Sequence, residues 1–227
     1  MNWNGLELPD NPYFSDDAVI IYCADCRDIL PLIPDKSVDL VLTDPPYGIG
    51  EAAGKNHSRG NHAPPKRYAI MDWDDRPISQ ELIDMVILSA RHSIIFGGNY
   101  YAVPPSSCWL VWDKVNGASD FADCELAWTN FKTAVRKYEW KWQGMLQQAG
   151  TPKEVRSHPT QKPAGLFGLI LSDYSKENEV ILDPFSGSGT TPYCAKKLGR
   201  KCIAIEIEEC YAEISAKRCS QSVMRLE

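Results

Sequence analysis

Four consecutive residues combine a carboxylate, two prolines and an aromatic ring. Asp44-Pro-Pro-Tyr47 follows the apolar run Val38–Thr43, which predicts a buried strand. Ligand sites of open α/β sheets lie beyond the carboxyl ends of their strands, which makes Asp44 a candidate for chemistry. Its carboxylate can accept a hydrogen of an amino group whose lone pair is delocalised into a base ring, and Tyr47 can stack on that base. A plain proline turn is the competing interpretation.

A second candidate is a glycine loop between an expected strand and an expected helix. In Asp183-Pro-Phe-Ser-Gly-Ser-Gly-Thr-Thr191, Gly187 and Gly189 let the backbone approach a ligand at a helix N-terminus. Glu206 ends the next expected strand, 17 residues after Gly189, where an acid can accept hydrogen bonds from two ribose hydroxyls. The third glycine of a dinucleotide fingerprint and the lysine of a P-loop are both missing. The alternative is a tight turn and a surface glutamate.

These residues need a sheet to bring them together, and strand-like runs alternate with helical patterns along the chain. Strands are predicted at 18–22, 38–43, 93–96, 108–112, 125–129, 180–182 and 201–205. Helices are predicted from Ser79, from Pro163, from Thr191 to Gly199 and after Glu208. The alternation predicts a doubly wound α/β fold: a mostly parallel central sheet with helices on both faces. The 227 residues suit one domain, 1–227.

Two long segments fit no regular element and carry most of the local positive charge. The net charge of the chain is −6, yet residues 132–162 hold seven cations against two acids, and residues 51–67 hold four against one. Such loops are usually functional or disordered. Insertions at 49–77 and 131–157 with such charge can contact the phosphates of a nucleic acid, and the alternative is that both are merely solvated loops. The aromatics Tyr138, Trp140 and Trp142 are expected either to contact bases or to pack on the core. The candidate phosphate contacts are Arg136, Lys137, Lys141, Lys55, Arg59, Lys66 and Arg67.

Cysteine and histidine spacing favours neither zinc nor disulfides. Cys23-x-x-Cys26 has no second pair at ligand spacing, so we expect reduced thiols and no metal. The N-terminal stretch lacks the pattern of a signal peptide, and no apolar run is long enough to span a membrane. These features predict a cytoplasmic protein, bacterial or encoded by a phage.

Three motifs in one order resemble a known family. Asp44-Pro-Pro-Tyr47, His158-Pro-Thr-Gln-Lys-Pro163 and Asp183-Pro-Phe-Ser-Gly-Ser-Gly189 are similar to those of the amino-methylating DNA methyltransferases, which modify adenine N6 or cytosine N4. Because the catalytic motif precedes the glycine loop, the chain resembles the circularly permuted β group. The resemblance covers about 19–218. It implies a Rossmann-like S-adenosylmethionine-dependent methyltransferase fold.

The resemblance also implies roles for individual residues. The catalytic motif would handle a target base flipped out of double-stranded DNA, with Pro45 acting through its carbonyl. The implied catalytic residues are Asp44, Pro45, Pro46 and Tyr47. The implied S-adenosylmethionine contacts are Asp25, Thr160, Lys162, Asp183, Phe185, Gly187, Gly189, Thr190 and Glu206.

Several functions remain open on the sequence. We expect a DNA adenine-N6 methyltransferase of a restriction-modification type, because cytosine-N4 enzymes of this group more often carry serine where Asp44 stands. A cytosine-N4 methyltransferase is the nearest alternative. An inactive DNA-binding module and a dehydrogenase on the same fold are alternatives of other classes, and a homodimer stays open.

Overall fold

The protein is described here by a computed structural model, which covers residues 2–3, 5–48, 77–117, 122–143, 146–158 and 160–221. The predicted phosphate contacts Lys55, Arg59, Lys66 and Arg67 therefore lie outside the described residues, with nearly all of the predicted insertion 49–77.

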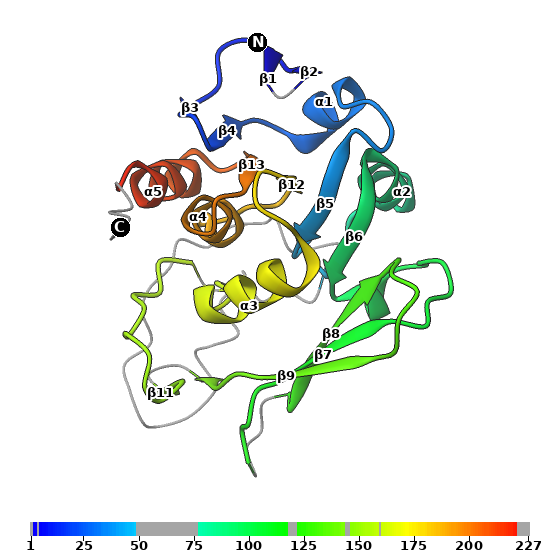
Figure 1. Ribbon diagram of the computed structural model, residues 1–227, viewed down its shortest axis with the longest axis vertical. Helices are drawn as coiled ribbons and strands as arrows, with labels where there is room; N and C mark the ends of the chain where they lie inside the picture. Colours follow the sequence, from blue (N-terminus) through cyan, green and yellow to red (C-terminus); the bar gives the residue numbers. More distant parts are fainter. Residues whose placement is uncertain are drawn as a thin grey trace.

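The described chain forms a large mixed sheet, seen obliquely through the middle of Figure 1. Its five central strands run parallel, and antiparallel strands join at both sides. The strands in order across the sheet are β3 (Phe14–Ser15), β4 (Val19–Cys23), β13 (Lys201–Glu206), β12 (Val180–Asp183), β5 (Val38–Thr43), β6 (Ala90–Phe96), β8 (Cys124–Thr129), β7 (Trp109–Asp113) and β9 (Arg136–Glu139).

Helices cover both faces of this sheet, as predicted (Figure 1). The helices are α1 (Cys26–Ile29), α2 (Gln80–Ser89), α3 (Ala164–Tyr174), α4 (Thr190–Lys197) and α5 (Glu209–Ser220), with 3₁₀ turns η1 (Leu30–Leu32) and η4 (Gly98–Tyr100). Strand side chains alternate between two apolar clusters, one shared with α3, α4 and α5 and the other with α1, η1 and α2. The predicted fold class is confirmed.

Local sequence explains where two of the helices begin. The Ser79 hydroxyl accepts a hydrogen bond from the Leu82 amide at 3.3 Å, which caps α2. Gly189 precedes α4 with φ +80°. A Cβ at this position would lie 2.2 Å from the Ser215 hydroxyl and 2.9 Å from its Cα. The glycine is needed both for the left-handed backbone and for the close approach of α5.

The segment 131–157 is more regular than its sequence suggested. The expectation of no regular element is wrong for β9, which pairs in parallel with β7, and for the hairpin of β10 (Trp142–Gln143) and β11 (Leu146–Gln147). Arg-Lys-Tyr-Glu lacks an apolar alternation because β9 is the last strand of the sheet and its side chains are mostly exposed. A small hairpin, β1 (Asn2–Trp3) with β2 (Leu6–Glu7), lies near the N-terminus.

The strand order creates a switch point between β12 and β5. From β12 the chain passes through α4 to β13 on one side, whereas from β5 it continues to β6 on the other. Ligands of doubly wound sheets bind where connections diverge in this way, beyond the carboxyl ends of the strands. These ends are Asp183 and Thr43, at the start of the two candidate motifs.

Neither cysteine pairing nor a membrane helix is part of this fold as described. All eight cysteines are free thiols. No helix within the described ranges has the length and apolar character needed to cross a membrane. Over the same ranges, no three His, Cys, Asp or Glu side chains gather in a way that could hold a metal ion.

Candidate active site

The two candidate motifs meet at the switch point. The Thr43 hydroxyl, one residue before Asp44, donates a hydrogen bond of 2.7 Å to the buried Asp183 carboxylate at the start of the glycine loop. The hydroxyl of Thr191, in the first turn of α4, lies 3.3 Å from the Leu42 carbonyl. Neighbouring strands β5 and β12 thus join the motifs directly.

A cavity of about 400 Å³ opens beside this junction. This volume lies in the range of small-molecule sites, about 300–1,000 Å³. Its wall includes Asp44 and Pro46 of the catalytic motif and eight of the nine predicted cofactor residues. These eight are Asp25, Thr160, Lys162, Asp183, Phe185, Gly187, Thr190 and Glu206.

Gly189 differs from the other predicted cofactor residues. It lies at the N-terminus of α4 and contacts Ser215 of α5. The structure explains this glycine by helix packing, whereas Gly187 borders the cavity with φ +49°.

Glu206 has the environment expected of a ribose acceptor. Its carboxylate accepts hydrogen bonds from the Gly187 amide at 2.7 Å and the Glu208 amide at 2.9 Å, and the side chain is 8% exposed. Burial raises the pKa of Glu206 to about 7, although the two backbone hydrogen bonds oppose this shift. A buried carboxylate on a cavity wall can accept hydroxyl donors, so this wall fits the ribose of S-adenosylmethionine.

This pKa makes cofactor affinity depend on pH. An ionised carboxylate is the stronger acceptor for ribose hydroxyls, and the free protein must release a proton from Glu206 when the pH lies below about 7. We expect the affinity for S-adenosylmethionine to rise between pH 6 and pH 8 and then level off. Glu206→Gln should flatten this rise and weaken binding at pH 8 by about 1.5–3 kcal/mol. Titration calorimetry at several pH values measures both effects.

Asp183 is a second group on the cavity wall whose ionisation affects this pH profile, and a control variant is needed for general effects of losing an acid. Burial raises the pKa of Asp183 to about 6, so Asp183 contributes to the lower part of the same profile. Glu213→Gln alters an exposed acid of α5 that pairs with Lys217 and should leave the profile unchanged. If the affinity of Glu206→Gln at pH 8 is unchanged, Glu206 does not bind the ribose and only stabilises the glycine loop.

Asp25 and Thr160 lie on the cavity wall but are held by neighbours. The Asp25 carboxylate caps α1 by accepting the Arg27 amide at 2.9 Å, and it also pairs with the Arg27 guanidinium. The Thr160 hydroxyl lies 3.1 Å from Nδ1 of His158. His158 is buried with its ring against Tyr211, and burial lowers its pKa to about 3, which keeps the imidazole neutral. Contacts of Asp25 and Thr160 with the cofactor stay predictions.

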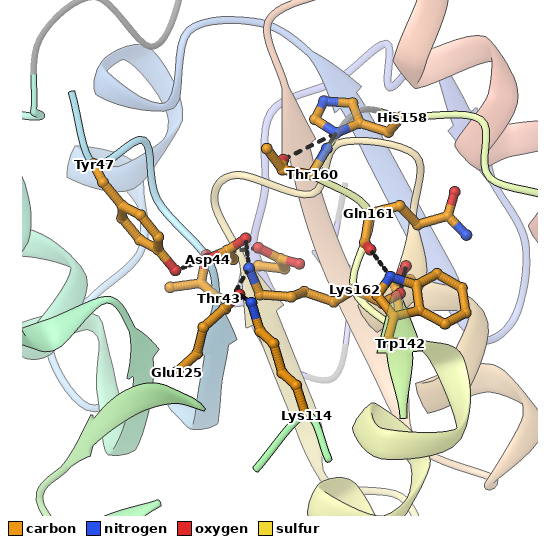
Figure 2. Close-up of polar contacts among 12 residues, drawn as sticks. Thr43, Asp44, Tyr47, Lys114, Glu125, Trp142, His158, Thr160, Gln161 and Lys162 are labelled. Carbon is orange, nitrogen blue, oxygen red and sulfur yellow. Dashed lines mark hydrogen bonds and ion pairs between the residues drawn. The ribbon is translucent and has the colours of Figure 1, made fainter. Parts of the chain in front are cut away.

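The Lys162 ammonium lies among the carboxylates of the site (Figure 2). It forms ion pairs with Asp44 Oδ2 at 2.5 Å and with Glu125 Oε2 at 3.1 Å. Glu125 Oε1 pairs with the Lys114 ammonium at 2.7 Å. Lys162 was predicted to approach the methionine carboxylate of the cofactor; it does border the cavity, but its charge faces Asp44 and Glu125.

Burial and charge oppose each other in this cluster. Burial raises the pKa of Asp44, and Lys162 counteracts the shift. Burial also lowers the pKa of Lys162, but the two carboxylates outweigh it and hold that pKa above its ordinary value. For Glu125 the two lysines outweigh burial and keep its pKa low. We therefore assign two carboxylates and two ammonium groups that balance in charge.

The aromatic ring of the catalytic motif is fixed from three sides. The Tyr47 hydroxyl donates a hydrogen bond to Asp44 Oδ1, and its ring stacks on Tyr100 with centroids 4.9 Å apart. A Cβ on Gly97 would lie 2.0 Å from the Tyr47 ring, so only glycine fits there. The Pro46 carbonyl accepts the Tyr101 hydroxyl at 2.5 Å, while Pro45 is buried.

The aromatics of 131–157 pack against the protein and not toward a ligand. Trp140 covers Gly165 of α3, where an added Cβ would lie 2.0 Å from the indole ring. The Trp142 indole N–H donates to the Gln161 carbonyl at 3.0 Å, and the Tyr138 hydroxyl donates to Asp173 at 2.6 Å. Of the two expectations for these rings, packing on the core is the one observed.

The cations Arg136, Lys137 and Lys141, predicted to contact DNA, do not line the cavity. Arg136 and Lys137 lie exposed on β9, and Lys141 follows this strand. Lys137 is partly neutralised by Glu139 at 2.5 Å and Asp113 at 3.5 Å. Arg136 is thus the better candidate of the two for a phosphate.

Sequence reasoning missed Glu125 and Lys114. A signal for Glu125 existed, because it is the one acid in the otherwise apolar expected strand 125–129. Lys114 follows the strand that ends at Asp113 and carries no comparable signal, since a lysine after a strand is ordinary at a surface.

The sheet, the switch point and the buried carboxylate of Glu206 fit the fold of the S-adenosylmethionine-dependent methyltransferases. Comparison with solved structures agrees on the fold. The chain matches PvuII DNA methyltransferase (cytosine-N4-specific) with a TM-score of 0.62 at 15% identity, covering 96% of this chain and 92% of the other. It matches the structure of an M1.HpyAVI–SAM complex with a TM-score of 0.53 at 23% identity, covering 89% and 99%.

Sequence comparison adds the chemistry. The family model described as DNA methylase, for N6 and N4 methyltransferases, matches residues 106–217. The curated Type II methyltransferase M2.LlaDCHI of Lactococcus lactis subsp. cremoris is 28% identical over 96% of this chain and 95% of its own length. These matches support an amino-methylating DNA methyltransferase that uses S-adenosylmethionine.

Proposed function

We propose that the protein methylates the N6 amino group of adenine in double-stranded DNA, at a base that has left the duplex. The observation that carries the proposal is the position of Asp44: its carboxylate lies on the wall of the cofactor cavity, one residue beyond the strand end joined to the glycine loop. A base held at Asp44 would therefore meet the cofactor within one connected site.

The chemistry requires an activated amino nitrogen. The lone pair of adenine N6 is delocalised into the ring, which makes it a weak nucleophile. Asp44 and the Pro45 carbonyl can each accept one amino hydrogen and draw the nitrogen toward tetrahedral geometry. The cofactor supplies an electrophilic methyl group on a sulfonium. Transfer of this methyl group would leave the electron pair of the C–S bond on sulfur and one excess proton on the amine, and the Asp44 carboxylate would accept that proton.

The target base must leave the duplex to reach this site, because Asp44 is only 18% exposed at its side chain. Tyr47 and its stacking partner Tyr100 provide an aromatic surface beside Asp44, and Tyr100 is 48% exposed. Stacking on a protein aromatic contributes about 1–3 kcal/mol per base. This surface favours a flipped base as the substrate.

Adenine is preferred over cytosine because of the residue type at position 44. The cytosine-N4 enzymes of the group that this chain resembles more often carry serine at this position. The name Type II methyltransferase of the M2.LlaDCHI relative supports a place in restriction-modification, and the motif order supports the permuted β group. A homodimer stays a prediction.

Nucleoside analysis tests this proposal. Unmethylated plasmid DNA is incubated with the protein and isotope-labelled S-adenosylmethionine, then digested and analysed by mass. N6-methyladenine is the expected product. N4-methylcytosine would overturn the adenine assignment and keep the class of enzyme. Cofactor binding without any methylated base would instead support the inactive DNA-binding module.

DNA contact by β9 is a separate prediction. Replacing Arg136, Lys137 and Lys141 by glutamine should weaken DNA binding and leave cofactor binding intact, because these residues do not line the cavity. Each lost phosphate contact should flatten the slope of log affinity against log salt by about 0.9. We expect a smaller change from Lys137 alone, since two acids already neutralise it. A wild-type slope in the triple variant would move the DNA contact to the cations of 51–67.

A further inference from the structure

Two charged residues outside the three motifs extend the catalytic ion pair. Figure 2 shows Lys114, Glu125, Lys162 and Asp44 converging from different parts of the chain. The contacts run from Lys114 to Glu125 at 2.7 Å, from Glu125 to Lys162 at 3.1 Å and from Lys162 to Asp44 at 2.5 Å. Charges alternate along this line, so each carboxylate touches at least one ammonium group.

The β7–β8 pairing places the outer two residues. Glu125 lies on β8 directly opposite Trp112 of β7, and the Lys114 amide continues the ladder by donating to the Asp123 carbonyl at 2.9 Å. The Lys114 ammonium also lies over the Trp112 ring, 5.1 Å from its centroid. The pairing of β7 with β8 therefore holds the side chains of Lys114 and Glu125 close together, with Glu125 next to Lys162.

The two oxygens of Asp44 are already engaged. Oδ1 accepts the Tyr47 hydroxyl, and Oδ2 contacts the Lys162 ammonium. A substrate amino group must compete for these oxygens. Competition at Oδ2 means that the ammonium has to move or to share its hydrogens, and a buried ammonium cannot simply turn to water.

Glu125 offers the ammonium another acceptor. Its Oε2 atom is buried and, within the part of the chain that the structure describes, receives no hydrogen bond of good geometry. It nevertheless lies 3.1 Å from Lys162 Nζ. A small shift of the ammonium toward Glu125 would complete this hydrogen bond and release Asp44 Oδ2.

We propose that Glu125 is a positioning residue that takes over the Lys162 ammonium while Asp44 accepts the amino hydrogen of the base. Lys114 neutralises the other oxygen of Glu125, so that Lys162 is shared between the two carboxylates and not captured by one. The inference rests on the proposed function, because it assigns a partner to the amino group at Asp44.

The test separates the charge of Glu125 from its size. Glu125→Gln keeps the size and removes the charge, whereas Glu125→Asp keeps the charge on a shorter side chain. Single-turnover rates are measured with saturating DNA and cofactor, together with the dissociation constants of both. We expect Glu125→Gln to lower the rate at least about tenfold with both dissociation constants within about threefold, and Glu125→Asp to regain part of the rate.

A double variant tests whether charge balance alone explains the effect. Lys114→Met with Glu125→Gln removes one charge of each sign, so the cluster stays balanced, but Lys162 still lacks its second carboxylate and has only a neutral amide oxygen there. We expect no recovery of rate. Recovery would show that Lys114 and Glu125 form only a structural pair, and would overturn the inference. Glu213→Gln, in an exposed pair of α5, is the matched control and should behave as wild type.

The remaining outcomes are distinguishable. A wild-type rate in Glu125→Gln overturns this inference and leaves the proposed function standing. Methylated cytosine from the wild type overturns only the adenine assignment, and no methyl transfer by the wild type overturns both proposals. If Glu125→Gln fails to fold, as judged by thermal melting, a rate for Glu125→Asp equal to that of the control variant overturns the inference, and a reduced rate with unchanged dissociation constants supports it.

Discussion

Asp44→Asn is expected to lower the rate of methyl transfer by about three orders of magnitude, within the range of about 10²–10⁴ for groups that handle protons in the reacting step. Asparagine has nearly the size of aspartate but lacks the negative charge that draws hydrogens from the amino nitrogen. Its amide can also present a donor where an acceptor is needed. Lys162 keeps Glu125 as a partner, and the cluster retains two of its three ion pairs.

Cofactor affinity should change little in this variant. The ribose is expected at Glu206, on β13, whereas Asp44 follows β5. Single-turnover transfer and titration calorimetry measure the two quantities on one preparation. Asp28→Asn, on the exposed face of α1, is the control for a general effect of losing an acid. Substantial turnover by Asp44→Asn would remove Asp44 from the catalytic role.

The second large effect is expected on stability. Lys162→Met leaves Asp44 and Glu125 as two neighbouring carboxylates without their shared cation, and the Lys162 side chain is only 8% exposed. Removing one partner of a buried ion pair typically costs about 3–5 kcal/mol of unfolding free energy. We expect a value near the lower end, because Asp44 and Glu125 are 18% and 23% exposed and water screens them in part. Urea denaturation measures the loss.

The pH dependence distinguishes this cause from a packing defect. Without Lys162, the pKa of Asp44, which burial already raises, should lie further above its unfolded value in the folded state, and the pKa of Glu125 should rise from the low value that the two lysines maintain together. The folded variant then binds more protons than the unfolded chain, so its stability falls as the pH rises through those values. The difference from wild type should therefore be larger at pH 8 than at pH 5. Adding Asp44→Asn to Lys162→Met should recover part of the lost stability. A packing defect would depend neither on pH nor on the added Asp44→Asn substitution.

The sequence by itself determined the fold class and the motifs that line the candidate site. Seven predicted strands and four predicted helices appear within a few residues of their expected bounds, because buried parallel strands and amphipathic helices leave local patterns of apolar residues. Thr43 and Asp183 end adjacent strands, which places the two motifs side by side. Motifs at strand ends are predictable because the sheet brings these ends to one edge.

Tertiary structure alone decided which side chains share the site and which support it. Strand β9 forms because β7 offers it a backbone partner, and no pattern in Arg136–Glu139 encodes that pairing. Trp140 became a packing residue because Gly165 leaves room for its ring. Glu125 reached Lys162, 37 residues away in the chain, because β8 runs beside β6. Contacts of this kind depend on distances between elements, which a local pattern of residue types does not contain.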